Sequence, residues 1–250
     1  MEILEFGNKN KEVLLMIHGF ESPYQLFEDY IRFFSDNYHI FIPILPSHNK
    51  NKSEEFVSFD ICAKQISEYI SQRSDMKVNV FAMSMGGVLA MKLIQNKTLD
   101  IQNVILDGSP LLGTSKFMKN FLTKQYISMT NKTKKRNKRL IKQAINSMVP
   151  ENKLQRFLDV IDAMSNQSII NYLNEIFTYR IPSDLDLSNI RLTYIHGTKI
   201  NEMLAKKTAK YLKENYNANT ICFNGKGHCE NSIFNTYYMC KLLKLLLLNK

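Results

Sequence analysis

Short apolar segments rich in β-branched and aromatic residues recur along the chain, and amphipathic segments separate them. This alternation is typical of a parallel β-sheet wrapped by helices. The apolar segments predict strands at residues 2–6, 12–17, 38–43, 77–82, 103–107, 191–196 and 219–223. We therefore expect an α/β fold with a mostly parallel central sheet flanked by helices.

Apolar residues at helical spacing predict helices between these strands. Residues 27–34 and 62–70 each carry an apolar stripe at i, i+3 and i+4 spacing. Residues 88–94 are apolar almost all round, which predicts a helix buried against the centre of the sheet. The apolar segment 240–250 is interrupted by Lys241 and Lys244 and is far shorter than the ~20 residues of a membrane span. We expect it to be a final helix packed on the sheet.

One long stretch, from Asp107 to Arg191, contains no predicted strand. A loop of that length would be exceptional in a compact domain. Two amphipathic patterns lie inside it, at residues 154–164 and 169–177. We expect a single domain over residues 1–250, with a helical cap, the cap segment (residues 113–182), inserted within it.

The net charge of +10 is concentrated in this cap segment. It holds 13 Lys/Arg against 4 Asp/Glu, and the basic run at residues 132–139 holds six of those bases. A charge run is usually a solvated face, but this one could favour acidic substrates or a weak contact with an anionic membrane surface. The chain has no groove-reading motif and the basic run has no aromatic residues interleaved with its lysines and arginines, so we expect no specific nucleic-acid binding.

The cysteines and histidines show no spacing typical of a metal site or a disulfide framework. Residues 1–12 lack the basic start and apolar core of a secretory signal, so we expect a cytoplasmic protein that begins near Met1. The one glycine-rich turn that follows a strand, at residues 82–87, does not have the pattern of a phosphate cradle. We expect neither a metal nor an organic cofactor.

That turn, Ala-Met-Ser-Met-Gly-Gly, lies between a predicted strand and a predicted helix. A serine on a strained strand-to-helix turn needs small residues two positions away on either side, because the backbone there passes close to the neighbouring strands. The turn would place the Met85 N–H at a helix N-terminus, where an oxyanion could form. Ser84 is therefore a candidate nucleophile. The alternative is a helix N-cap serine beside two packing glycines.

Two further motifs fit this chemistry. His18-Gly19-Phe20 ends an early strand and would present the Phe20 N–H as a second oxyanion-hole donor, with His18 itself structural. The loop ending in His228 follows the last predicted strand and could bring an imidazole to Ser84. Because a serine hydroxyl needs a base that titrates near neutrality, His228 is the candidate general base. A surface histidine is the alternative.

Together these motifs resemble those of the α/β-hydrolase fold family, and within it the bacterial monoacylglycerol-lipase-like carboxylesterases. The resemblance rests on HGF at 18–20, PILPSH at 43–48, the serine turn at 82–87 and GKGH at 225–228. Ser47 stands where the family's P-x-LPGHG turn has a glycine. The resemblance implies that carboxylic esters or thioesters of small to medium acyl groups are hydrolysed through an acyl-enzyme on Ser84.

The acid of the triad is the residue for which the sequence leaves alternatives. The family usually carries an Asp after the next-to-last strand, where this chain reads HGTKINEML and Glu202 stands beside the expected position. The other known placement follows the strand after the serine turn, where Asp107 stands. We place Asp107 first, Glu202 second and a Ser-His dyad third. A turn residue is the alternative role for Asp107.

Two other functions fit the same sequence. An acyltransferase or thioesterase would use the same triad. A non-catalytic binding protein on a hydrolase scaffold is suggested by the absence of an Asp in the loop after His196.

Overall fold

The computed structural model describes residues 1–52 and 54–248. One seven-stranded sheet forms its centre, in the order β1-β3-β2-β4-β5-β6-β7. β1 pairs antiparallel with β3, and the other neighbouring strands are parallel. The strands are β1 (Glu2–Gly7), β2 (Val13–Ile17), β3 (His39–Ile44), β4 (Val78–Met83), β5 (Ile101–Asp107), β6 (Arg191–Gly197) and β7 (Asn219–Phe223). The predicted α/β class and all the predicted strands are confirmed, and observed strand ends lie within two residues of the predicted ones.

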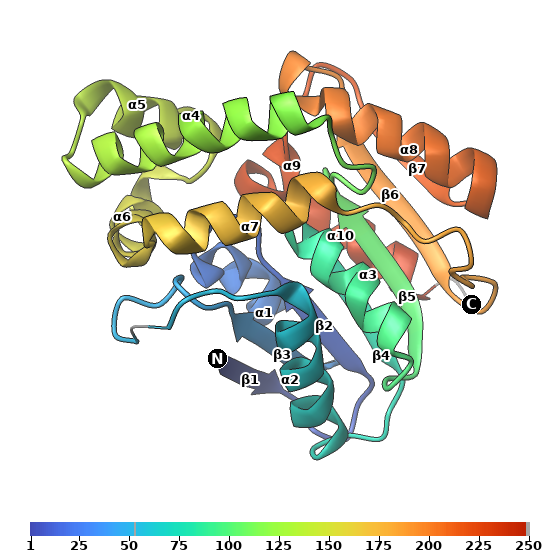
Figure 1. Ribbon diagram of the computed structural model, residues 1–250. Helices are drawn as coiled ribbons and strands as arrows, with labels where there is room; N and C mark the ends of the chain where they lie inside the picture. The colour runs from blue at the N-terminus through green and yellow to red at the C-terminus, as the bar shows by residue number, and fades with distance from the viewer. Residues whose placement is uncertain (53, 249–250) are drawn as a thin grey trace.

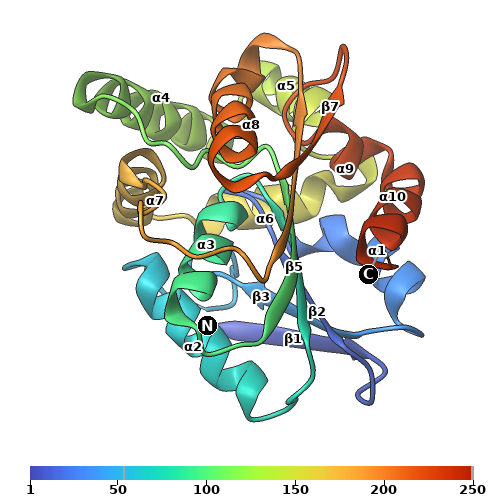
Figure 2. The same ribbon diagram turned by 90° about the vertical axis from the view of Figure 1, so that its right-hand side faces the viewer.

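Helices cover both faces of the sheet (Figures 1 and 2). In β2, Val13, Leu15 and Ile17 belong to one apolar core and Leu14 and Met16 to the other, so the strand is buried on both sides. The helices of the first face are α2 (Phe59–Ser71), α3 (Gly86–Asn96) and α8 (Met203–Tyr216). Those of the second face are α1 (Glu28–Phe34), α9 (Glu230–Phe234) and α10 (Thr236–Leu248).

The helices predicted between strands are present, and the one predicted at 27–34 begins as a 3-10 turn, η1 (Tyr24–Phe27), that continues into α1. The predicted C-terminal helix is α10; residues 249 and 250 of that prediction lie outside the described residues. Across residues 1–52 and 54–248, no helix combines the length and apolar character that a membrane span requires.

The cap segment contains helices that lie beyond the carboxyl ends of the parallel strands (Figure 1). They are α4 (Lys116–Lys134), α5 (Lys138–Ser147), η2 (Glu151–Lys153), α6 (Leu154–Ala163) and α7 (Asn166–Thr178). The two amphipathic patterns coincide with α6 and α7, whereas α4 and α5 were not predicted. α4 packs along α7 and against α6. Several of its large apolar side chains nevertheless stay exposed. Its apolar residues therefore do not form the single stripe by which an amphipathic helix is predicted.

Candidate active site

Ser84 stands on the turn between β4 and α3, with a left-handed backbone φ of 51°. Its N–H donates to the Asp107 carbonyl at 2.7 Å, which fixes the turn to the end of β5. A Cβ added to Gly86 would lie 2.6 Å from the Ile17 carbonyl oxygen, and one added to Gly87 would lie 2.0 Å from Ser109 Oγ. The two glycines therefore allow α3 to start directly against the sheet, which is the physical requirement that the sequence pattern expresses.

His228 lies in the loop between β7 and α9, with its ring between Ser84 and Glu202. Nε2 is 2.8 Å from Ser84 Oγ, and Nδ1 is 2.6 Å from Glu202 Oε1. Because a carboxylate can only accept, Nδ1–H donates to Glu202, which leaves Nε2 free to accept the Ser84 proton. The ring fits because Gly108 has no side chain: a Cβ there would lie 2.7 Å from His228 Cε1.

Glu202 ends the short helix η3 (Ile200–Glu202) and is fully buried. Its second oxygen, Oε2, accepts a hydrogen bond of 2.7 Å from the Gly197 N–H. Burial by itself would raise the pKa of Glu202, but the hydrogen bond and charge of His228 and the Gly197 N–H together hold it below its usual value. The carboxyl is thus ionised where it meets the imidazole, as a partner for a developing imidazolium must be.

Asp107, which the sequence analysis placed first, is not against His228. It lies at the end of β5, where its Oδ2 accepts from Ser232 Oγ at 2.5 Å. No hydrogen bond joins it to His228 among the described residues. Burial raises the pKa of Asp107 to about 6, despite the opposing hydrogen bond from Ser232. The structure places Glu202, and not Asp107, against the imidazole: η3 turns the chain back towards Gly197, and Glu202 reaches His228 from there.

The two predicted oxyanion donors flank Ser84. A Cβ on Gly19 would lie 3.3 Å from Ser84 Cβ, so the loop that carries Phe20 passes directly beside the nucleophile. Met85 precedes the first turn of α3. Among the hydrogen bonds of the described residues, neither the Phe20 N–H nor the Met85 N–H has a partner. Both donors are available to a developing oxyanion.

His18 has the structural role that the sequence suggested. Its Nε2 accepts from the Leu45 N–H at 3.3 Å, and its Nδ1 lies 2.9 Å from the Gly19 carbonyl oxygen. Burial lowers the pKa of His18 to about 4, so the ring is neutral. Its ring lies 4.6 Å, centroid to centroid, from that of His48, whose Nε2 accepts from the Glu21 N–H. The two histidines tie the loop that bears Phe20 to the loop after β3.

Glu21, directly after Phe20, is a residue that the sequence pattern did not single out. It is buried, has a φ of 55°, and accepts a hydrogen bond from Thr130 Oγ1 of α4. Burial raises the pKa of Glu21 to about 7, against the opposing effects of Thr130 and the Lys134 charge. The Phe20 ring also contacts Tyr126 of α4 and Tyr172 of α7. The cap segment is therefore attached to the loop that carries Phe20, the predicted oxyanion donor.

Replacing Glu21 by Gln should remove a pH dependence of stability. Because the folded-state pKa is about 7 against an ordinary 4.5, stability is greatest below pH 4.5 and falls as the pH rises to about 7. This difference in pKa corresponds to about 3 kcal/mol of unfolding free energy that wild type loses between the two pH values. Because Gln does not ionise, Glu21→Gln should exceed wild type in unfolding free energy by up to that amount at pH 8. Urea unfolding from pH 5 to 8 measures it, with exposed Glu214→Gln as control. Parallel curves for wild type and Glu21→Gln would contradict the expectation.

An apolar cavity of about 420 Å³ lies between the cap segment and α8. Its lining includes Leu122 of α4, Phe177 of α7 and Leu204 of α8. It also includes Pro110, two residues after the glycine that touches His228, and Asn201, next to Glu202. The cavity thus reaches chain neighbours of Gly108 and Glu202, while Ser84, His228 and Glu202 are not themselves among its lining residues.

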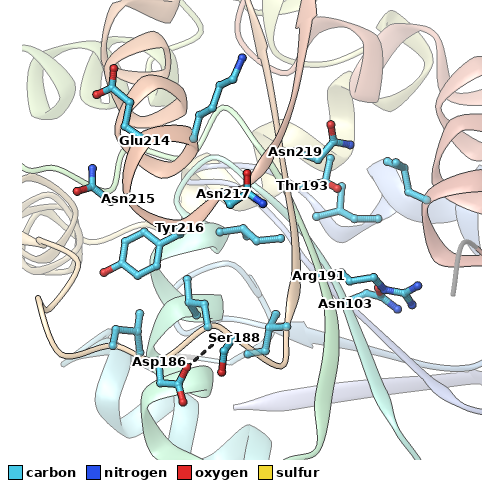
Figure 3. A pocket seen from close by; sticks show the side chains of 17 residues that line it. Asn103, Asp186, Ser188, Arg191, Thr193, Glu214, Asn215, Tyr216, Asn217 and Asn219 are labelled. Carbon is cyan, nitrogen blue, oxygen red and sulfur yellow. Dashed lines mark hydrogen bonds between the residues drawn. The ribbon is translucent and has the colours of Figure 1, made fainter.

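A larger cavity, about 860 Å³, lies at the opposite end of the sheet (Figure 3). Asn103, Arg191 and Asn219 line it from the amino ends of β5, β6 and β7, whereas Ser84 follows the carboxyl end of β4. Asp186 there accepts from the Ser188 N–H at 2.9 Å. In parallel sheets the reactive loops follow the carboxyl ends of strands, so this cavity is not part of the candidate active site. Within the described residues, no three His, Cys, Asp or Glu side chains gather as metal ligands would.

Comparisons with known proteins agree with this fold. No family model matches the chain. A Haemophilus influenzae protein described as "Putative esterase/lipase" is 24% identical over 226 residues, which cover 88% of this chain and 77% of that protein. Among solved structures, a "putative alpha/beta hydrolase family protein" of Desulfitobacterium hafniense superposes with a TM-score of 0.77 at 20% identity, covering 98% of this chain and 100% of that one.

A structure from work on the carboxylesterases of Nitrososphaera gargenis superposes with a TM-score of 0.76 at 12% identity, over 98% of this chain and 93% of the other. These superpositions, together with the parallel sheet, establish the fold. The chain has the α/β-hydrolase fold.

Proposed function

We propose that this protein is a serine hydrolase that cleaves carboxylic esters or thioesters of small to medium acyl groups through an acyl-enzyme on Ser84. The observation that carries the proposal is the pair of hydrogen bonds that joins Ser84 Oγ to His228 and His228 to the ionised Glu202. The esterases and hydrolases among its relatives support hydrolase or esterase activity. A non-catalytic scaffold would have no need to maintain this arrangement.

The geometry supports a two-step reaction. Ser84 Oγ attacks the acyl carbonyl while His228 Nε2 takes its proton, and Glu202 stabilises the imidazolium that forms. The Phe20 and Met85 N–H groups hold the oxyanion. His228 then gives its proton to the departing alcohol or thiol, which leaves the acyl group on Ser84. In the second step water attacks the acyl carbonyl while His228 takes a proton from it, and His228 then returns that proton to Ser84 Oγ as the acid is released.

The apolar cavity beside this site accounts for the expected acyl group. At about 420 Å³ it lies within the range of small-molecule sites, and its lining is mainly apolar. Thr208, at its floor, donates to the Leu204 carbonyl and so presents no unpaired hydroxyl to a chain. We place the acyl chain in this cavity because its lining reaches Asn201, the neighbour of Glu202, and we place the acyl carbonyl at Ser84. Helices α4 and α7 would cover it as a cap.

Reaction with a fluorophosphonate tests the proposal most directly. The probe phosphonylates only an activated serine, so intact-protein mass spectrometry should show one adduct, and peptide mapping should locate it on Ser84. The same protein should release p-nitrophenol from short- and medium-chain esters. Product analysis with an added alcohol separates hydrolysis from acyl transfer. Absence of both adduct and turnover would favour a binding protein on this scaffold.

A further inference from the structure

Large apolar side chains stand exposed on α4, η3 and α8, which all contribute to the lining of the apolar cavity. Phe117 on α4 is 80% exposed, Ile200 of η3 is 86% exposed and Met203 of α8 is 60% exposed. Met118 and Phe121 of α4 are exposed as well. We refer to these five residues as the apolar rim. Met118, Ile200 and Met203 also line the cavity, so the rim meets the cavity through these three residues.

Exposed lysines flank the rim without nearby carboxylates to balance them. α4 contains five lysines and neither Asp nor Glu. Lys116 and Lys124 are exposed and have no hydrogen-bonding or ionic partner among the described residues. Lys119 between them donates only to the neutral Asn174. On the other side of the mouth, Lys207 of α8 lines the cavity. The surface is thus apolar at its centre and cationic at its edge.

The charge indicates what kind of surface can cover the rim. A symmetric contact with a second copy would bring the lysines of one α4 close to those of the other, in a protein whose net charge is already +10. An anionic lipid bilayer matches both parts, since phenylalanine side chains enter the boundary between headgroups and acyl chains while lysines remain at the phosphates. Attachment of this kind lies along the surface and needs no membrane-spanning helix.

The basic run at 132–139 does not offer the same surface. Arg136 forms a two-bond ion pair with Asp162, at 2.8 and 2.6 Å, and Lys134 Nζ donates to the Met164 carbonyl. Part of the run thus holds the turn between α4 and α5 to α6. The run itself contains no large apolar side chain, and Met129, which precedes it on α4, is 38% exposed, well below Phe117 at 80%.

We propose that the apolar rim, with Lys116 and Lys124, docks this protein reversibly on an anionic lipid bilayer, with the mouth of the cavity facing the lipid. Docking would carry the cavity to the surface in which amphiphilic molecules gather. The proposal goes beyond hydrolysis and does not rest on it, because the rim is independent of Ser84. Binding can therefore be measured with Ser84→Ala protein, so that a failure of docking and a failure of catalysis are distinguished.

Co-sedimentation with vesicles tests the proposal, using phosphatidylcholine alone and phosphatidylcholine mixed with phosphatidylserine. We expect binding to the mixed vesicles and much weaker binding to the neutral ones. Lys116→Gln with Lys124→Gln should lower the partition coefficient roughly 30-fold, since each lysine near an anionic surface strengthens binding roughly fivefold. Phe117→Asn with Phe121→Asn should lower it at least about tenfold, because less apolar surface enters the boundary. Thermal unfolding checks that these variants fold.

The matched control is Lys135→Gln with Lys138→Gln, which removes the same charge from the exposed part of the basic run. We expect this variant to lower the partition coefficient less than about threefold, because its charges lie away from the docked surface and are screened by salt. An equal loss in both lysine pairs would overturn the proposal in favour of general charge attraction. Absence of binding to either vesicle would overturn it too. A dimer in gel filtration that Phe117→Asn with Phe121→Asn abolishes would instead make the rim a contact between copies.

Discussion

Replacing Ser84 by Ala is expected to lower kcat for a p-nitrophenyl ester by about 10⁶. The variant keeps His228, Glu202 and both oxyanion donors, but it has no nucleophile, and the acyl-enzyme cannot form. A small residual rate above that in buffer should remain, because the oxyanion donors still stabilise attack by water. Steady-state hydrolysis measures the loss, with Ser188→Ala at the far end of the sheet as the control. A Ser84→Ala protein within tenfold of wild type would contradict the proposed mechanism.

The same position also stores backbone strain. Ser84 has a φ of 51°, which L-residues other than Asn and Asp seldom adopt and which costs of order 1 kcal/mol or more. Ser84→Gly should therefore be inactive like Ser84→Ala, yet more stable than it by about 1 kcal/mol. This difference would show that the turn is held in its conformation for the nucleophile and at the expense of stability.

The parts of this fold that could be predicted are those that local physical chemistry determines. The strands are buried on both faces, so they read as continuous apolar segments. The serine turn needs Gly86 and Gly87 because the chain meets Ile17 and Ser109 there, and this requirement leaves a local pattern in the sequence. The roles of Ser84, His228, Phe20 and Met85 stay predictions, but the structure brings these residues together.

The parts that could not be predicted depend on contacts between distant segments. Glu21 is buried only because α4 lies over it, and its partner Thr130 is far along the chain. Helix α4 leaves Phe117 and Phe121 exposed, so no buried stripe marks it. Ser47, in place of a glycine, has a φ of 62° and bonds to Ser168 of α7 at 2.7 Å. The serine that replaces the family's glycine in this turn thus attaches the turn to α7 of the cap segment.

The identity of the acid depends in the same way on tertiary structure. Glu202→Gln should lower kcat by about 10⁴ with little change in KM. The reason is the tautomer: if the Gln carbonyl accepts the Gly197 N–H, its amide NH₂ faces His228 Nδ1 and can only donate to it. The proton is then displaced to Nε2, which can no longer accept from Ser84. A shifted pH profile of kcat, with folding intact, separates this effect from a merely structural one.

Asp107→Asn provides the comparison, because Asp107 bonds to Ser232 rather than to His228. We expect kcat to fall less than about tenfold, since the substitution alters the hydrogen bond to Ser232 and leaves the hydrogen bonds of His228 unchanged. Its folded-state pKa of about 6 lies above the ordinary 3.8, so its carboxyl lowers stability as the pH rises through 6. The Asn variant should therefore be more stable than wild type at pH 8, by up to about 3 kcal/mol. A collapse of kcat in Asp107→Asn, with Glu202→Gln active, would restore the order that the sequence suggested.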